Sequence, residues 1–409
     1  MLRICGRLYF AKNTNHKKRS KNIYTTAGLD EWIRIVREQM PQLSKPQAWV
    51  LALWSFGMVI AGTCGITSVT RTISELTEAK EANVRQRLRE WNRSQEDKPG
   101  KRRQELVVSE SFTPLLHWVL SWWAPDERRL LLAMDATTLG DRYVVLAISV
   151  VYRACAIPIA WQVYAFAGQS SWKPAWLALF AQFAGVVPAD WTVLVLSDRG
   201  LYAAWLFHAI RALGWHPFVR INGNAHYRPR AESTFHPVKQ LANRHGVDWS
   251  GPVVIFKQRS LDCTLLVRWE AGYQDPWLIL TDLFPDQASI AWYGCRSWIE
   301  CGFRQTKRAG WQWHQTRMTD PDRAARHWLA IAVATLWVVS VGGQVDAALP
   351  ASTLDPLEPV AKSKTSQPRL LSCFRQGLLR IRVALIKHEP LPVGRFFPDY
   401  GPHDGKPTL

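Results

Sequence analysis

The sequence has few cysteines and no cluster of metal-binding Cys and His residues. Its seven cysteines are odd in number, and no two of them form a Cys-x-x-Cys pair. A disulfide framework needs paired cysteines, and a structural zinc site needs Cys or His ligands at characteristic spacings. The composition therefore argues against both, and a reducing cytoplasm is the expected setting.

The sequence also lacks a convincing membrane span or secretory signal. Residues 46–70 and 327–345 contain no Asp, Glu, Lys or Arg, so length alone would admit both as spans. The first stretch, however, has several Gly, Ser and Thr after Ile60, and the second has a short apolar centre. The basic segment from Met1 to Lys21 has no continuous apolar run. We therefore expect no membrane association. A basic protein of the membrane surface is the alternative.

Acidic residues are scarce relative to basic ones. The 409 residues include 33 Asp plus Glu against 51 Lys plus Arg, a net charge of +18. A chain of this length can form two or three domains with substantial cores. The basic excess favours a polyanionic partner, because each phosphate that is neutralised releases a counterion. Charge alone does not distinguish DNA from RNA or from an anionic membrane.

One charged pattern lies in residues 291–307. Tyr293, Arg296, Glu300 and Lys307 are separated by three, four and seven residues. At roughly 100° per residue, this spacing predicts one helix with all four side chains on one face. A carboxylate would then lie between two cations. A solvated helix face with ordinary charge pairs is the alternative.

Two aspartates are predicted at the ends of buried strands. Asp135 ends the apolar stretch 129–135, and Asp198 follows the apolar stretch 191–196 after one serine. Together with Glu300 they provide three carboxylates, the ligands that hard divalent cations prefer. A site with two such ions can bind both the attacking and the leaving oxygen of a phosphodiester.

These residues together resemble the DDE transposases of bacterial insertion sequences. The resemblance rests on Asp135, on Asp198-Arg-Gly and on the pattern Tyr293-x2-Arg296-x3-Glu300-x6-Lys307. More narrowly, the chain is similar to the IS-four-like group, which carries a Tyr-Arg-Glu-Lys signature around its third acidic residue. All four signature positions match. The resemblance is strongest over residues 130–337 and looser in the N-terminal part.

The resemblance implies an α/β fold. Its ribonuclease-H-like catalytic core, a mixed sheet flanked by helices, is interrupted by a β-rich insertion and preceded by a helical DNA-binding region. Three predicted strands joined by short turns, then alternating helices and strands, fit this succession. The predicted strands are 129–135, 142–152, 156–164, 191–196 and 216–221, with 251–257, 263–270 and 276–282 in the insertion. The predicted helices after the N-terminal region are 112–123, 172–183, 201–213, 322–341 and 369–385.

The same pattern predicts six regions along the chain. They are a basic, disordered arm (1–28), a helical DNA-binding domain (29–125), the first part of the core (126–222), the insertion (223–290), the helical second part of the core (291–345) and a linker with a C-terminal helix and tail (346–409). Within the DNA-binding domain, a break is predicted at 44–46 and further helices at 67–76 and 83–91. The last of these carries several arginines, for which simple surface charge is the alternative to DNA contact.

By resemblance, Asp135, Asp198 and Glu300 are the catalytic residues and bind two Mg²⁺ ions, for which Mn²⁺ can substitute. The implied reaction is metal-dependent cleavage at the ends of the element and strand transfer into target DNA. It follows a cut-and-paste route with a hairpin intermediate. The implied partners are double-stranded DNA, as terminal inverted repeats and as target, and a second copy of the chain on DNA. The implied location is the bacterial cytoplasm, at the nucleoid during activity.

The resemblance also implies residues that bind DNA. Tyr293, Arg296 and Lys307 are expected to contact phosphates beside the scissile bond, and Arg304 to contribute on the same helix. A tryptophan of the insertion is expected to stack on an extruded base. Trp249, Trp269 and Trp277 lie in that region, and Trp269 is preferred because it follows Arg268 near a predicted strand end. A role in the core is the alternative for each.

Two other functions fit the same residues. One is a catalytically silent, domesticated DNA-binding protein, which the intact acidic triad disfavours. The other is a ribonuclease-H-like metal nuclease that cuts without joining, and only the signature around Glu300 separates it, by analogy.

Overall fold

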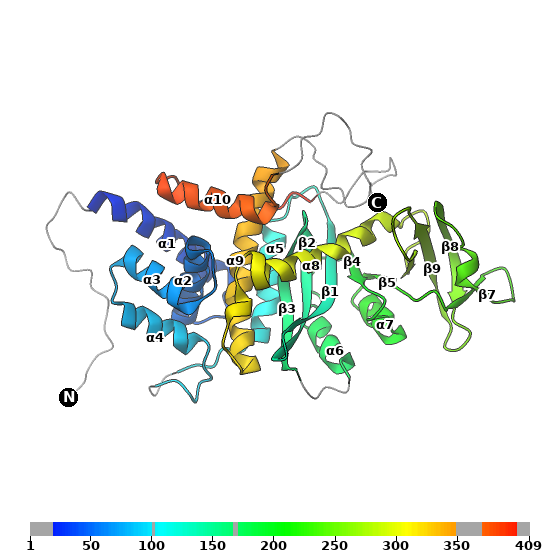
Figure 1. Cartoon of the computed structure of the whole chain (residues 1–409), viewed down its shortest axis with the longest axis horizontal. Helices are drawn as coiled ribbons and strands as arrows, with labels where there is room; N and C mark the ends of the chain where they lie inside the picture. Colours follow the sequence, from blue (N-terminus) through cyan, green and yellow to red (C-terminus); the bar gives the residue numbers. More distant parts are fainter. Residues whose placement is uncertain (1–18, 100–102, 167–170, 349–369, 399–409) are drawn as a thin grey trace.

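A computed structural model describes residues 19–99, 103–166, 171–348 and 370–398, with the side chains of residues 19–25 excepted. Three regions follow one another along its long axis (Figure 1). A helical bundle lies at one end, a sheet covered by helices lies in the middle, and a β-rich part lies at the other end. The predicted architecture of a large mixed sheet flanked by helices is confirmed.

The N-terminal bundle contains the predicted helices. It consists of α1 (Arg19–Gln39), α2 (Lys45–Ala61), α3 (Ile66–Thr77) and α4 (Glu81–Trp91). The predicted break at 44–46 is confirmed, since the side chain of Gln47 accepts the Ser44 backbone N–H at the start of α2. Helix α1 packs against the C-terminal helix, and a Cβ at Gly28 would lie 2.9 Å from the Leu385 side chain.

One boundary of the predicted arm is wrong. The arm was expected to extend to residue 28, but α1 already begins at Arg19. Residues 19–28 contain no proline and one glycine, so no residue in them prevents the helix from extending toward the N-terminus. The part of the predicted arm from residue 1 to 18 lies outside the described residues.

The strands form one mixed sheet. Its order is β3-β2-β1-β4-β5-β10-β9-β8-β6-β7. Strands β1 to β3 form the predicted antiparallel meander, and β4 and β5 add to β1 in parallel. The strands are β1 (Arg129–Leu139), β2 (Tyr143–Tyr152), β3 (Cys155–Ala165), β4 (Thr192–Ser197), β5 (His216–Arg220), β6 (His226–Pro229), β7 (His236–Pro237), β8 (Val247–Ile255), β9 (Leu261–Trp269) and β10 (Trp277–Thr281).

The predicted position of Asp135 at a strand end is wrong. Strand β1 continues to Leu139, and Asp135 pairs with Ala147 of β2 in the middle of the ladder. The parallel pairing of β1 with β4 does end earlier, at Ala133 and Leu196. The last residues of β1 therefore pair on one side only. The sequence Ala-Thr-Thr, whose two threonines suggested a strand end, belongs to this half-open part of the strand.

The β-rich insertion extends the central sheet. Strand β10 pairs antiparallel with β5 through Leu280 and Val219, and β9, β8, β6 and β7 follow. The three predicted insertion strands correspond to β8, β9 and β10. The insertion thus attaches directly to the edge of the core that β5 would otherwise leave open.

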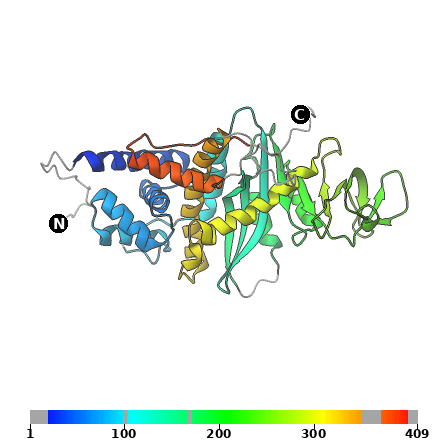
Figure 2. The same cartoon turned by 45° about the horizontal axis from the view of Figure 1, so that its top comes forward.

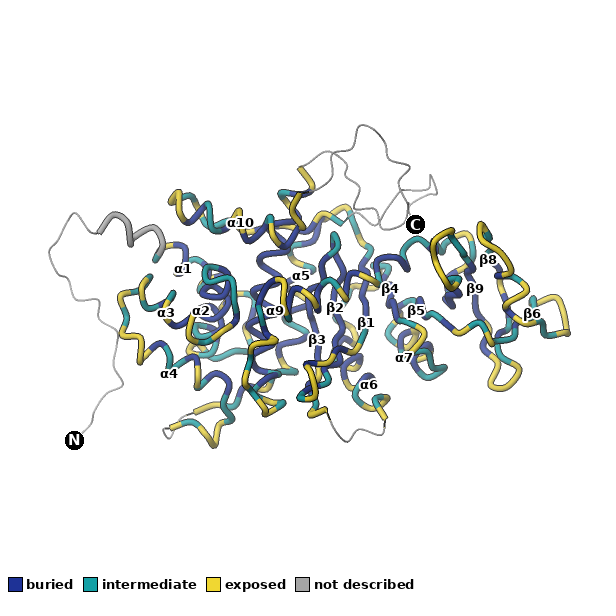
Figure 3. The backbone as a smooth tube through the Cα atoms, viewed as in Figure 1, coloured by how far each residue is buried: buried dark blue, intermediate teal, exposed yellow. Residues whose placement is uncertain are grey.

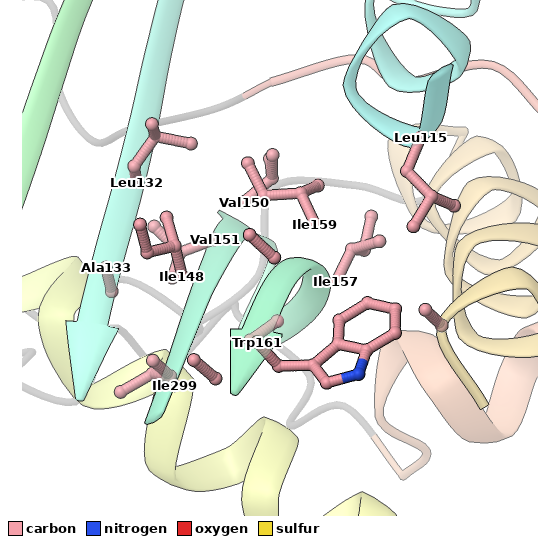
Figure 4. Close-up of a cluster of buried hydrophobic side chains, with 14 of the residues drawn as sticks. Leu115, Leu132, Ala133, Ile148, Val150, Val151, Ile157, Ile159, Trp161 and Ile299 are labelled. Atoms are coloured by element: carbon pink, nitrogen blue, oxygen red, sulfur yellow. The ribbon is translucent and has the colours of Figure 1, made fainter. Parts of the chain in front are cut away.

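Helices cover the sheet and connect it to the bundle. They are α5 (Phe112–Ser121), α6 (Lys173–Ala181), α7 (Ala204–Ala212), α8 (Trp298–Arg304), α9 (Pro321–Ala347) and α10 (Cys373–Ile386), with short 3-10 turns η1 (Val108–Ser111), η2 (Val238–Gln240) and η5 (Trp313–Gln315). Figure 4 shows Ala133 of β1 and Ile148 of β2 on the side of Ile299 of α8, and Trp161 of β3 on the side of Leu115 of α5. These apolar contacts fix α8 on the sheet.

Helix α9 is the central core helix. Its residues are buried on all faces, as the dark trace in Figure 3 shows. Trp337 stacks on Trp32 of α1 with ring centroids 4.1 Å apart, which joins the bundle to the core. By length and composition α9 could cross a membrane, but 89% of its most apolar window is buried inside the protein. Helices α2 and α3 meet the same criterion only as a pair bent by 97°.

The C-terminal helix α10 crosses α9 at two glycines. A Cβ on Gly342 would collide with the carbonyl oxygen of Cys373, and one on Gly377 would collide with that of Val338. The backbones can approach this closely only because neither residue has a side chain. Figure 2 shows α10 beside α1, above the bundle. Of the predicted linker 346–368, the part from residue 349 onward lies outside the described residues.

One regular helix was predicted over residues 291–307, and this prediction is wrong. The segment consists of a 3-10 helix η3 (Ile290–Ser297), the short α8 and a π-helical turn η4 (Gln305–Ala309). Tyr293 and Arg296 lie in the 3-10 part, Glu300 in α8 and Lys307 in the π turn. The changes of pitch rotate the four side chains away from one common face, so they reach different partners.

Candidate active site

Three carboxylates from distant parts of the chain meet around one guanidinium. Nη2 of Arg296 lies 2.8 Å from Oδ2 of Asp135 and 3.5 Å from Oδ2 of Asp198. Nη1 of the same arginine lies 2.6 Å from Oε1 of Glu300. The three acidic residues predicted from sequence are therefore gathered at one place, with an arginine of the signature between them.

The sheet explains why the two aspartates are neighbours. Ala133 of β1 is paired with Leu196 of β4, and Asp135 and Asp198 each follow two residues later. Parallel neighbours in register bring such residues to the same level of the sheet. Oδ1 of Asp198 accepts the backbone N–H of Gly200 at 2.9 Å, which turns the chain after β4. Helix α8 packs on β1 and brings Glu300 to this level.

The site is more exposed on the side of the glutamate. The side chains of Asp135 and Arg296 are 18% and 16% exposed, whereas that of Glu300 is 56% exposed. Burial raises the pKa of Asp135 above its ordinary value, although the charge of Arg296 acts in the opposite direction. Burial alone would lower the pKa of Arg296, but the nearby charges led by Asp135 raise it overall.

The donor set suits divalent cations, but the carboxylates are spread around Arg296. Asp135, Asp198 and Glu300 offer only oxygen donors, as Mg²⁺ and Mn²⁺ prefer. Across the described ranges, no three Asp, Glu, His or Cys side chains lie close enough together to hold one ion. The guanidinium instead lies where the three carboxylates converge. The three carboxylates therefore suit a metal site by the chemistry of their donors, but a side-chain cation takes the place where they converge.

Tyr293 is buried beside the second aspartate. Its hydroxyl donates to the carbonyl oxygen of Ser197 at 3.2 Å, directly before Asp198. Burial raises the pKa of this phenol to about 12. The residue thus holds the end of β4, and its expected contact with a DNA phosphate stays a prediction.

Lys307 lies beside the last residues of β1, on the face that Thr137 shares with Asp135. Its Nζ donates to Oγ1 of Thr137 at 2.8 Å and to the carbonyl oxygen of Thr138 at 3.2 Å. Burial lowers the pKa of this ammonium, and the charge of Arg308 acts in the same direction. Lys307 therefore connects the π turn to the half-open end of β1, two residues beyond Asp135.

Two further arginines flank the acidic residues. Arg304 is exposed on α8 one turn after Glu300, and its only described polar contact is with the Cys301 sulfur at 3.7 Å. Arg199 pairs with Asp275 of the insertion at 2.8 Å. Arg199 was not among the site residues predicted from sequence, although it belongs to the Asp198-Arg-Gly sequence.

The tryptophans of the insertion lie in different surroundings. Trp269 donates its indole N–H to the Tyr273 carbonyl at 2.9 Å and lies against His245, with ring centroids 4.6 Å apart. Trp277 lies 5.4 Å from the ring of Tyr293, edge to face. A shallow pocket has Trp277 in its wall. The other lining residues are Arg268, Glu270, Tyr273 and Asp275. Trp277, which the sequence argument named but did not prefer, is the one in contact with the signature.

The three arginines of α4, together with Arg93 just after it, are only partly available to a ligand. Arg85 pairs with Glu81 at 2.8 Å, and the guanidinium of Arg87 lies 4.8 Å from the centroid of the Trp49 ring. Arg89 is exposed and Arg93 half-buried. Two of the four arginines thus stabilise the bundle itself, and DNA binding by this region stays a prediction.

Comparison with known proteins agrees with the sequence argument at the level of the family. The family model described as "Transposase DDE domain" matches residues 129–337, a range that contains all three acidic residues and the insertion. No curated protein matches the chain. One solved structure with similarity is the cryo-EM structure of the piggyBac transposase synaptic complex with hairpin DNA, at 10% sequence identity. The alignment covers 90% of this chain and 80% of that chain with a TM-score of 0.40, too low to carry a conclusion.

Proposed function

Because this chain belongs to the transposase DDE domain family, we propose that it is a DDE transposase that cuts the ends of an insertion sequence and joins them to target DNA. The observation that carries the proposal is the meeting of Asp135, Asp198 and Glu300 around one guanidinium. Three carboxylates repel one another, and the single charge of Arg296 offsets only part of this repulsion, so further cations are expected to bind there during function.

In this proposal the three carboxylates bind two Mg²⁺ or Mn²⁺ ions. Asp135 on β1, Asp198 after β4 and Glu300 on α8 would hold these ions between the sheet and the helix that covers it. When bound, such ions provide Lewis-acid activation of a water or 3′-hydroxyl nucleophile and stabilise the leaving 3′-oxygen. No side chain of the protein is then required as the nucleophile.

Three other side chains near the carboxylates contribute to positioning the DNA in this proposal. Arg304 is exposed one turn beyond Glu300 and is available for a phosphate, to which a guanidinium can donate two parallel hydrogen bonds. Lys307 orders the end of β1 through Thr137, and from there it can offer its remaining N–H to the backbone of DNA. Tyr293 keeps the end of β4 in place through Ser197. These side chains hold a phosphodiester against the carboxylates and limit its motion.

A base extruded beside the cut would stack on the insertion. Trp269 was preferred from sequence, but the contact between Trp277 and Tyr293 favours Trp277 as the stacking residue. A hairpin intermediate and a cut-and-paste route are part of the same proposal.

We propose the predicted domain organisation with one boundary changed. The order β3-β2-β1-β4-β5, with the first three strands antiparallel, supports a ribonuclease-H-like core. The bundle α1–α4 is the proposed binding region for the terminal inverted repeats, with Arg89 on its exposed surface. A homodimer on DNA and a bacterial, nucleoid-associated location complete the proposal.

The experiment that tests this function uses the DNA that flanks the gene. The flanking DNA should contain inverted repeats on both sides of the gene. A pre-cut duplex that ends in such a repeat should be joined to a supercoiled target DNA when the protein and Mg²⁺ are added. Binding without any reaction would favour the silent DNA-binding protein. Cleavage of uncut ends without joining would favour the metal nuclease.

A further inference from the structure

We propose that Arg296 is an internal counter-ion that occupies the position of the divalent cations in the DNA-free protein. A DNA phosphate takes over this guanidinium when DNA binds, and the carboxylates are released for the cations. This inference rests on the proposed function, because it concerns the same three carboxylates. It makes the affinity for metal depend on whether DNA is present.

The geometry makes Arg296 the cation that partly neutralises the three carboxylates. The same guanidinium reaches Asp135, Asp198 and Glu300 at 2.8, 3.5 and 2.6 Å. Within the part of the chain that the structure describes, no other Lys, Arg or His forms an ion pair with any of these carboxylates. An ion that is to bind all three must therefore displace Arg296 or remain at the edge of the site.

The charges favour exchange of the guanidinium for divalent cations once DNA has arrived. Three carboxylates and one guanidinium leave a net charge of −2, which still attracts a divalent cation. When a phosphate holds the guanidinium instead, the carboxylates regain their full charge of −3 for the cations. Coulomb attraction at such short distances is strong in a partly buried site, so this difference changes affinity appreciably.

The position of Arg296 allows such a movement. Its Nε is buried and has no hydrogen-bond partner among the described residues, so the guanidinium is not fully satisfied where it lies. Its partner Glu300 is 56% exposed, so the guanidinium is next to the open side of the site. A rotation of a long side chain toward that side exchanges a carboxylate for a phosphate without moving the helix. By linkage, metal should also tighten DNA binding by the same factor.

The test measures Mn²⁺ binding to the full-length, DNA-free protein, from the electron paramagnetic resonance signal of free Mn²⁺. Arg296→Gln should bind Mn²⁺ about tenfold or more tightly than the wild type. Arg304→Gln is the matched control. Arg304 carries the same charge and lies four residues after Glu300, as Arg296 lies four residues before it, but Arg304 does not contact the three carboxylates. This variant should change the affinity much less.

Further arms separate this inference from the proposed function. Adding a duplex with the flanking repeat should tighten Mn²⁺ binding to the wild type and should do so less for Arg296→Gln. Arg296→Lys, which keeps one charge but cannot reach three carboxylates, should lie between wild type and Arg296→Gln, and it serves if Arg296→Gln does not fold. Equal Mn²⁺ affinity of wild type, Arg296→Gln and Arg304→Gln would overturn the inference. If Asp135→Asn also left the affinity unchanged, the proposed metal site itself would fall.

Discussion

Asp135 and Arg296 are 161 residues apart in the sequence, yet Oδ2 of the aspartate and Nη2 of the arginine lie 2.8 Å apart. Asp135 belongs to the sheet and Arg296 to the segment that carries the signature, so this contact joins the first part of the core to the second. The same arginine reaches Glu300, four residues later in its own segment. Predictions about the active site and about the scaffold follow from this arrangement.

Replacement of Lys307 by Ala should weaken DNA binding and slightly destabilise the protein. Loss of the hydrogen bonds to Thr137 and Thr138 should cost about 1 kcal/mol of the free energy of unfolding. Loss of one phosphate contact should reduce the slope of log K against log salt by about one. Arg308→Ala removes the same charge at an exposed neighbour and is the control. A salt slope equal to that of the wild type would restrict Lys307 to a structural role.

Trp277→Ala should reduce stacking of a base beside the cut. With 2-aminopurine placed next to the repeat boundary, binding of the wild type should change the fluorescence. This change should be smaller in Trp277→Ala because the aromatic platform is lost, a stacking contribution of roughly 1–3 kcal/mol. Trp269→Ala, whose indole is bound to the Tyr273 carbonyl, is the matched control and should behave as the wild type. The reverse pattern would return the role to Trp269.

Gly342→Ala should destabilise the junction of α9 and α10. The added Cβ would collide with the Cys373 carbonyl, and the backbone cannot yield without separating the two helices. We expect a loss of roughly 3 kcal/mol in the free energy of unfolding, measured by urea denaturation. Gly65→Ala is the control, since a Cβ there meets only the Thr63 hydroxyl at 3.5 Å. Similar losses for both variants would show that the close crossing has no special role.

His327 should make the protein sensitive to acid. It is buried in α9 against Trp54, and burial lowers its pKa to about 4, below the ordinary value of 6.5. The unfolded chain therefore binds a proton more readily than the folded one, so stability is lost as the pH falls from about 6.5 toward 4. Between pH 7 and pH 5 this residue should account for about 2 kcal/mol of lost stability.

The measurement for His327 compares urea denaturation at pH 7 and pH 5 in the wild type and in His327→Phe. The phenyl ring keeps an aromatic contact with Trp54 but cannot take up a proton. The variant should lose less stability on acidification than the wild type. An equal loss in both proteins would mean that other groups cause the acid sensitivity.

Much of the fold could be predicted from local sequence patterns. The strands of the meander are continuous apolar runs, and a two-residue turn at Arg153 and Ala154 joins β2 to β3. Both of these turn residues have positive φ, which matches the twist of a tight hairpin. Asp198 was correctly predicted at a strand end, because β4 ends at Ser197. These features depend on residues close together in the sequence.

Other features depend on contacts that the sequence pattern does not encode. The position of Asp135 inside β1 follows from one-sided pairing of the strand with β2, which the sequence Ala-Thr-Thr after Asp135 does not reveal. The extension of the sheet through β10 requires pairing of Leu280 with Val219, far apart in the chain. The change from 3-10 to α to π geometry around Glu300 cannot be predicted from a helical pattern that assumes a constant value of about 3.6 residues per turn. The spacing of residues in the sequence predicted that Arg296 and Glu300 lie side by side. It could not predict that Asp135 and Asp198 also contact the Arg296 guanidinium.

The most direct test of the account is cleavage of a duplex that carries the flanking inverted repeat and adjoining DNA. The purified wild type should cut at the repeat boundary with Mg²⁺ and not with EDTA. Asp135→Asn, Asp198→Asn and Glu300→Gln should each reduce cutting by about a thousandfold or more while still binding the duplex. Unreduced cutting by any one of these variants would remove that residue from the proposed metal site, and cutting in EDTA would contradict the metal-dependent mechanism.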